Sequence, residues 1–180
     1  MGKGKEKKRV NYRLIYDAII MILLIAFDRF LKIYAVRKLK DHPSKSIIKG
    51  ILELNYIENT GAAFGLLEGQ RFFFVLVSVI IFAAIVYLVI RMPAKKKFLF
   101  AHIALSLLAA GSMGNMTDRL LYDHVIDYIY FSSIHFPVFN LADLYVLLAT
   151  VVLVILLLFV YKEDDLNFLR FKEKRLREID

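Results

Sequence analysis

The stretch Phe72-Phe-Phe-Val-Leu-Val-Ser-Val-Ile-Ile-Phe-Ala-Ala-Ile-Val-Tyr-Leu-Val-Ile90 decides the fold class, because it is an unbroken apolar segment without a charged residue. A helix needs about 20 predominantly apolar residues to cross the hydrocarbon core of a bilayer. Arg71 precedes this segment and Arg91 follows it, so that basic side chains stand at both ends. The segment therefore predicts a transmembrane helix.

Three further segments have a similar length and apolar character, at residues 12–36, 98–118 and 138–161. The first is not interpreted as a signal peptide, because its polar end, Asp28-Arg-Phe-Leu-Lys32, is not a small-residue cleavage site. We therefore expect an all-α membrane protein with four transmembrane helices and a small extracytoplasmic segment that contains β-structure.

The composition agrees with a small integral membrane protein whose ends are charged. Of 180 residues, 59% are hydrophobic and 23% are charged, and the mean hydropathy is +0.57. The net charge of +8 could indicate a nucleic-acid partner, but the Lys and Arg residues flank the apolar segments, so we expect none. The chain has no cysteine, and its four histidines lack zinc-site spacing. We expect neither a metal nor a cofactor.

The distribution of basic residues predicts the topology. Six Lys or Arg precede residue 14, four lie at 91–97 and six follow residue 161, against seven in the two segments on the other side. Because cytoplasmic loops carry the excess of Lys and Arg, both termini are expected in the cytoplasm. We expect one membrane domain, 1–180, with cytoplasmic segments 1–12 and 162–180 and extracytoplasmic segments at about 37–71 and 119–137.

Four carboxylates lie in or beside the apolar segments: Asp28, Asp118, Asp127 and Asp143. A carboxylate at membrane depth costs a few kcal/mol or more, so each one is a candidate for function. Asp28 is expected in the outward half of the first helix, Asp118 at the end of the third, Asp127 in an outer loop and Asp143 in the second turn of the fourth. All four therefore belong to the outer side of the membrane.

The two outer segments have strand-like patterns. Residues 51–57 alternate between apolar and polar side chains, and Asn59-Thr-Gly61 is a turn signal. Residues 125–139 are also strand-like. The charged tail, 164–180, has apolar residues at helical spacing, which suits either a helix on the membrane surface or a solvated tail.

Helical spacing groups the polar residues without deciding their roles. Asp28 and Lys32 are four residues apart, which suits either a self-neutralising ion pair or a carboxylate that supports a site by hydrogen bonding. Asn115 and Asp118 share one helix face, and so do Asn140 and Asp143. By spacing alone, Asp118 with Asp143 is as sensible a catalytic pair as Asp127 with Asp143.

Taken together, the chain resembles the lipoprotein signal peptidases, also called signal peptidase II. The resemblance covers nearly the whole chain and rests on five blocks in order: Asp28-Arg-Phe-Leu-Lys32, Asn59-Thr-Gly-Ala-Ala-Phe-Gly65, Gly114-Asn-Met-Thr-Asp-Arg119, Val125-Ile-Asp127-Tyr and Phe136-Pro-Val-Phe-Asn-Leu-Ala-Asp143. Small departures from the family pattern occur at Leu31, at Ser112-Met113 and at Glu58. They leave the catalytic pair untouched.

The resemblance implies an aspartyl endopeptidase of the bacterial inner membrane that removes signal peptides from prolipoproteins, cutting before the diacylglyceryl-modified cysteine. It implies that Asp127 and Asp143 are catalytic. The residues implied to support them or bind substrate are Asp28, Lys32, Asn59, Gly61, Asn115, Asp118, Arg119, Asn140 and Ala142. The implied partners are the diacylglyceryl prolipoprotein, membrane lipid and globomycin-type inhibitors, with the enzyme as a monomer whose active site faces the outer leaflet.

Three other functions compete with this interpretation. A transporter or ion channel would need carboxylates near the membrane midplane and broken helices, whereas these carboxylates gather at one side. A Ser–Lys protease has candidate serines at 78, 106 and 112, but the only Lys in a membrane segment is Lys32, four residues from Asp28. A lipid-binding scaffold without enzyme activity would keep its function after Asp127→Asn.

Overall fold

The computed structural model describes residues 3–61 and 66–169, and the side chains from residue 12 onward. Its long helices are α1 (Lys3–Leu39), α2 (Arg71–Arg91), α3 (Leu99–Tyr122) and α4 (Leu141–Ile155), and a π-helical turn, Leu156–Val160, prolongs α4. The expected helix at 72–90 is confirmed as α2. The helix expected to end at about Asp118 continues one further turn to Tyr122, where Asp123 adopts a left-handed conformation (φ 68°) and donates its backbone N–H to the Arg119 carbonyl.

Three helical segments of the described chain are long and apolar enough to cross a membrane: Arg71–Arg91, Lys96–Tyr122 and Leu141–Val160. The helix α1 is longer than any of these, but it is not among them. Unlike them, it carries charged residues within its apolar stretch, among them Asp17 and Asp28. The structure therefore supports a mostly helical membrane protein with three candidate spans.

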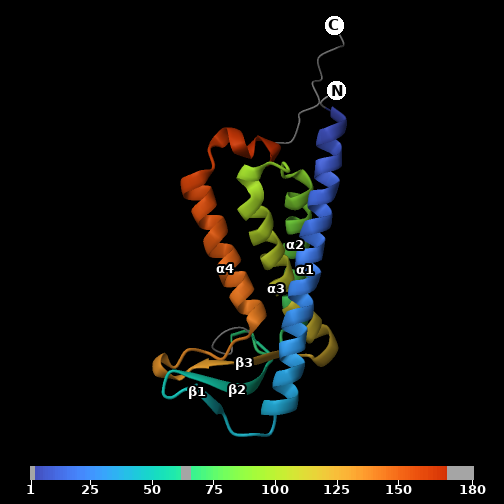
Figure 1. Ribbon diagram of the computed structural model, residues 1–180. Coiled ribbons are helices and arrows are strands. Elements are labelled where there is room, and N and C mark those ends of the chain that lie inside the picture. The colour runs from blue at the N-terminus through green and yellow to red at the C-terminus, as the bar shows by residue number, and fades with distance from the viewer. Residues whose placement is uncertain (1–2, 62–65, 170–180) are drawn as a thin grey trace.

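A small antiparallel sheet confirms the strands expected in the two segments between the helices. It is built from β1 (Lys45–Ile48), β2 (Leu52–Asn59) and β3 (Val125–Phe131), in the order β1-β2-β3. Asn59 pairs with Val125 at one end of the β2–β3 ladder. Figure 1 shows the sheet lying across one end of the helices, while α1 begins and α4 finishes at the other end.

Two glycines of α3 allow close helix packing, Gly111 against α4 and Gly114 against Asp28 of α1. A Cβ atom added at Gly111 would lie 2.4 Å from the carbonyl oxygen of Ala142, and one added at Gly114 would lie 2.7 Å from Asp28 Oδ2. These small residues therefore permit tight contact between the helices. The contact brings the start of α4 beside the face of α3 that carries Asn115.

The C-terminal tail was expected to be either a surface helix or a solvated tail at 164–180. In the structure, Glu163–Leu169 form a 3-10 helix, and Arg91 binds the carbonyl of Phe168 through its guanidinium at 2.6 Å. Residues 170–180, and Ala62 to Gly65 of the Asn59–Gly65 block, lie outside the described residues.

Candidate active site

Asp143 lies in the first turn of α4, not in the second, because that helix begins at Leu141 and not at Val138. Asn140 is the N-cap. Its side-chain oxygen accepts from the Asp143 backbone N–H at 3.1 Å, and Asp143 Oδ2 accepts from the Asn140 backbone N–H at 3.1 Å. This capping box satisfies backbone donors that a helix start leaves open. It also holds the Asp143 carboxylate in one orientation.

Asp127 lies in β3 and is only 2% exposed. Asn140 donates to its Oδ1 at 2.6 Å, and Asn59, from the end of β2, donates to its Oδ2 at 2.8 Å. Burial first, and then the charge of Asp143, raise the pKa of Asp127 to about 7. This carboxyl group is therefore able to hold or release a proton near neutral pH.

Two asparagines connect the two carboxylates. Asn140 contacts both, since its amide nitrogen reaches Asp127 while its oxygen and backbone N–H bind Asp143. Asn115 donates to Asp143 Oδ1 at 2.7 Å, and its own oxygen accepts from Asn140 at 3.1 Å. Asn115 and Asn140, both implied by the resemblance to belong to the site, therefore lie in direct contact with its carboxylates.

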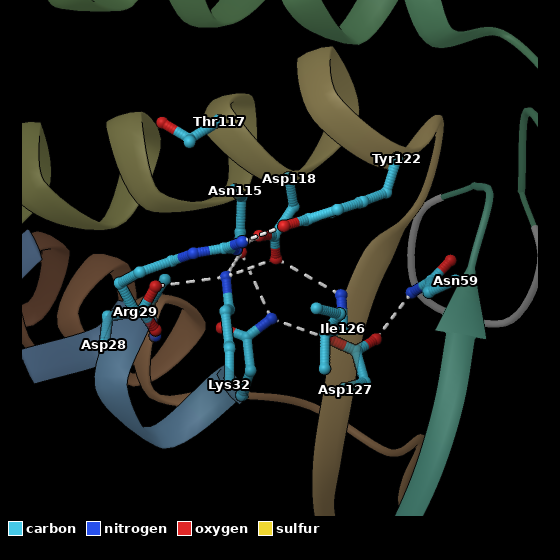
Figure 2. A network of polar contacts seen from close by, with 12 residues as sticks. Asp28, Arg29, Lys32, Asn59, Asn115, Thr117, Asp118, Tyr122, Ile126 and Asp127 are labelled. Carbon is cyan, nitrogen blue, oxygen red and sulfur yellow. Dashed lines mark hydrogen bonds and ion pairs between the residues drawn. The ribbon is translucent and has the colours of Figure 1, made fainter. Parts of the chain in front are cut away.

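A buried lysine is the centre of the neighbouring polar network (Figure 2). Lys32 Nζ lies 3.1 Å from Asp28 Oδ2, 2.8 Å from Asp118 Oδ2 and 2.9 Å from Asn115 Oδ1. The side chains of Lys32 and Asp118 are 0% exposed, and that of Asp28 is 1% exposed. The predicted Asp28–Lys32 ion pair is present, and Asp118 joins it from α3.

The remaining oxygens of Asp28 and Asp118 are also occupied. Asp28 Oδ1 accepts from the Ala142 backbone N–H at 3.1 Å. Asp118 Oδ1 accepts from Arg29 at 2.7 Å, and its Oδ2 accepts from the Ile126 backbone N–H at 3.2 Å. These two carboxylates therefore join α1, α3, α4 and β3, and all of their oxygens serve that purpose.

Asp127 and Asp143 open into one cavity of about 350 Å3, which we call the carboxylate cavity. Neither Asp28 nor Asp118 lines it. Its polar wall consists of Asn59, Gly61, Asn115, Arg119, Asp127 and Asp143. Its apolar wall consists of Val125, Phe136, Pro137, Val138 and Phe139. Arg119 is fixed at its edge, donating to the Gly61 carbonyl at 3.0 Å and lying 4.4 Å from the centre of the Phe74 ring.

The four carboxylates therefore form two pairs with different surroundings. Asp28 and Asp118 neutralise Lys32 in the interior, whereas Asp127 and Asp143 receive amide hydrogen bonds and face a cavity. A pair of carboxylates set in a ring of amides is suited to exchanging protons with a bound molecule.

Sequence reasoning missed two features. It gave Arg29 no role, although the guanidinium binds Asp118 and also contacts the hydroxyl of Tyr122. It also missed a buried pair at the other end of the helices, in which His102 Nδ1 lies 2.7 Å from Asp17 Oδ2. Both features join helices that are far apart in sequence, so no local spacing could have indicated them. Among the described residues, no three His, Asp or Glu side chains are placed to hold a metal ion.

The fold and the site together define an integral membrane protein with a paired-carboxylate cavity at one end of its helices. Residues 20–159 match the sequence family described as Signal peptidase (SPase) II. The chain belongs to this family of membrane peptidases.

Curated relatives agree with this assignment. The chain is 35% identical to a lipoprotein signal peptidase of Clostridium novyi (strain NT) over 79% of its own length and 97% of the relative's. It is 37% identical to that of Clostridioides difficile (strain 630), over 78% and 93% of the two lengths. With that of Streptococcus pyogenes serotype M1 the identity is 36%, over 81% and 92%.

Two solved structures share the fold, and both are described as bacterial membrane enzymes. One, at 30% identity, superimposes with a TM-score of 0.69 over 92% of this chain and 94% of the other. The second, at 33% identity, has a TM-score of 0.70 over 81% and 94%. The similarity therefore extends over both the helices and the sheet, and this chain is a multi-pass membrane protein.

Proposed function

We propose that the protein is an intramembrane aspartyl endopeptidase that removes the signal peptide from diacylglyceryl-modified prolipoproteins, cutting before the lipidated cysteine. The family and the names of the relatives support the lipoprotein substrate. The observation that carries the catalytic assignment is that Asp127 and Asp143, alone among the four carboxylates, line the cavity.

In the proposed reaction Asp127 and Asp143 share one proton, because two neighbouring carboxylates do not both ionise easily. The ionised member takes a proton from water, and the water oxygen attacks the scissile carbonyl carbon. The protonated member polarises the carbonyl oxygen, and the pair later protonates the leaving amine. Each proton-transfer role contributes about 10²–10⁴-fold to the rate. The pair titrates as a unit.

The asparagines would orient the pair through hydrogen bonds to its oxygens, and the lysine would act on it only through Asn115. Asn140 holds both carboxylates, and Asn115 connects Asp143 to Lys32. In this proposal Asp118 and Asp28 act as structural partners of Lys32, which favours Asp127 over Asp118 as the catalytic partner of Asp143.

The walls of the cavity suit an extended peptide. Gly61 at its edge has no side chain to block a substrate, and its carbonyl is fixed by Arg119. The apolar wall, with Phe136 and Phe139, suits the hydrophobic residues of a signal peptide. The diacylglyceryl group would remain among membrane lipids, and globomycin-type inhibitors would occupy the same cavity of a monomeric enzyme.

We further propose that α1 is a fourth span, so that both termini lie in the cytoplasm and the carboxylate cavity faces the outer leaflet of the inner membrane. The charges that set α1 apart from the other spans are neutralised within the protein. Asp17 lies 3.3 Å from Arg13 and 2.7 Å from His102, and Asp28 is paired with Lys32. Paired charges that face the bundle interior are the form in which membranes tolerate them.

A cleavage assay on a diacylglyceryl prolipoprotein peptide in detergent micelles tests the proposal. Asp127→Asn and Asp143→Asn should each abolish cleavage in a folded protein. Asp41→Asn is the matched control, because Asp41 is exposed and asparagine tolerates its positive φ of 61°. Cleavage that persists in either variant would overturn the catalytic assignment.

A further inference from the structure

A second pocket lies on the opposite face of the strands that carry the catalytic pair. Successive side chains of a strand point to opposite faces, and here Asn59 and Asp127 face the carboxylate cavity while Glu58 and Ile126 face the second pocket. This pocket has a volume of about 290 Å3, and none of its lining residues lines the carboxylate cavity. It is therefore a separate site.

Basic side chains of α1 dominate the second pocket, which we call the basic pocket: Arg29, Arg37 and Lys40. Arg29 binds Asp118 at 2.7 Å and lies 5.0 Å from the centre of the Tyr122 ring. Lys40 binds Glu58 at 2.8 Å. Within residues 3–61 and 66–169, Arg37 has no hydrogen bond or ion pair, and its side chain is exposed. One full positive charge at this pocket thus lacks a partner.

The same face of α1 becomes apolar in the direction of the membrane. Ile22, Ala26, Arg29, Ile33 and Lys40 follow one another at steps of three, four or seven residues, so they form one stripe along the helix. Ile22 and Ala26 are exposed, and Ile33 is an exposed wall of the pocket. The stripe therefore has a cationic end at the sheet and an apolar end within the proposed span. These two ends are complementary to the anionic headgroup and the acyl chain of a phospholipid.

We propose that the basic pocket binds the phosphate of an anionic phospholipid, with an acyl chain lying along the apolar part of the α1 stripe. Arg37 would supply the unpaired charge, and Tyr56 and Tyr122 would supply aromatic walls of the kind found at membrane interfaces. The inference rests on the proposed span of α1, and it is independent of the proteolytic activity.

Tryptophan quenching by brominated lipids tests this proposal, because the chain contains no tryptophan of its own. Phe30→Trp places one reporter on exposed α1 surface beside the pocket, and Phe73→Trp places one on the sheet end of α2. In nanodiscs, brominated phosphatidylcholine should quench both tryptophan reporters, and quenching of Phe30→Trp would establish that α1 contacts lipid. Failure to quench Phe30→Trp would refute the span, and with it the lipid site.

Selectivity is measured with brominated phosphatidylglycerol in a phosphatidylcholine background. We expect phosphatidylglycerol to be enriched about fivefold around the Phe30→Trp reporter and not around Phe73→Trp. The factor follows from about 1 kcal/mol of attraction between one basic residue and an anionic lipid surface. Arg37→Gln should remove the enrichment. Lys38→Gln is the matched control, since Lys38 is an exposed neighbour that changes the net charge equally but does not line the pocket.

Four results of these measurements would overturn the proposal. Equal enrichment at the two reporters, or equal loss in Arg37→Gln and Lys38→Gln, would mean that only general electrostatic attraction acts. Enrichment that survives Arg37→Gln would mean that the pocket is not the site. Displacement of the lipid by millimolar glycerol phosphate would identify the pocket as a site for soluble phosphates instead.

Discussion

Asp118→Asn is the substitution that separates a structural carboxylate from a catalytic one. It removes one of two negative charges beside Lys32, whose side chain is 0% exposed, and it also removes the partner of Arg29. Breaking a buried ion pair costs about 3–5 kcal/mol when the remaining charge is left unpaired. Asp28 still lies 3.1 Å from Lys32, so we expect the lower end, about 3 kcal/mol.

For a chain of this size that loss corresponds to a fall in melting temperature of about 6–12 °C. Thermal unfolding in detergent, followed by circular dichroism, measures it. Cleavage assayed well below the transition should continue, because the carboxylate cavity keeps Asp127 and Asp143. The paired experiment is Asp127→Asn, for which we expect loss of cleavage without such a fall. Complete loss of cleavage in Asp118→Asn at an unchanged melting temperature would refute the reasoning and make Asp118 part of the chemistry.

Three further predictions concern the same site. The pKa of Asp127 is raised from 3.8 to about 7, so the stability contributed by its protonated form is fully present below pH 3.8 and is lost as pH rises through 7. The free energy of unfolding should therefore fall by up to about 4 kcal/mol between these pH values, and Asp127→Asn should flatten this fall. Cleavage should decline above about pH 7. Gly114→Ala would place a Cβ 2.7 Å from Asp28 Oδ2, so we expect the free energy of unfolding in a denaturation experiment to fall by about 1–3 kcal/mol. An unchanged stability would mean that α3 and Asp28 separate freely. Asn140→Ala removes the N-cap of α4, worth about 1 kcal/mol, and a hydrogen bond that lowers the pKa of Asp127. Cleavage should therefore slow, and the alkaline limb of its pH profile should move to higher pH. A slower rate with an unmoved limb would indicate that Asn140 has a packing role alone.

The sequence predicted α2 well because an uncharged apolar run has one stable arrangement in a bilayer, a helix whose backbone groups are satisfied internally. It predicted the strands at 51–57 and 125–139 for a similarly local reason, the alternation of side chains. Boundaries set by capping were less accurate. The fourth helix was expected to begin at Val138, but Asn140 is its N-cap and Leu141 is its first residue.

The roles of the four carboxylates show where local information ends. Each pattern within one helix, such as Asp28 with Lys32, was predictable because neighbours three or four residues apart must share a face. The contact of Lys32 with Asp118 joins residues of different helices, and no spacing encodes it. By spacing alone, Asp118 remained as good a partner for Asp143 as Asp127 was.

By itself the sequence determined the membrane-spanning character of the apolar helices, the strands between them and the set of polar residues available for a site. Only the tertiary structure decided how that set is divided. Folding α1 against α3 buries Lys32 between Asp28 and Asp118, and Arg29 also binds Asp118, so that two carboxylates meet two cations. The packing of α4 and β3 leaves Asp127 and Asp143 hydrogen-bonded to amides and facing a cavity whose wall also carries Arg119. The physical reason is that a carboxylate's chemistry depends on its surroundings, and those surroundings come from segments that meet only in the folded chain.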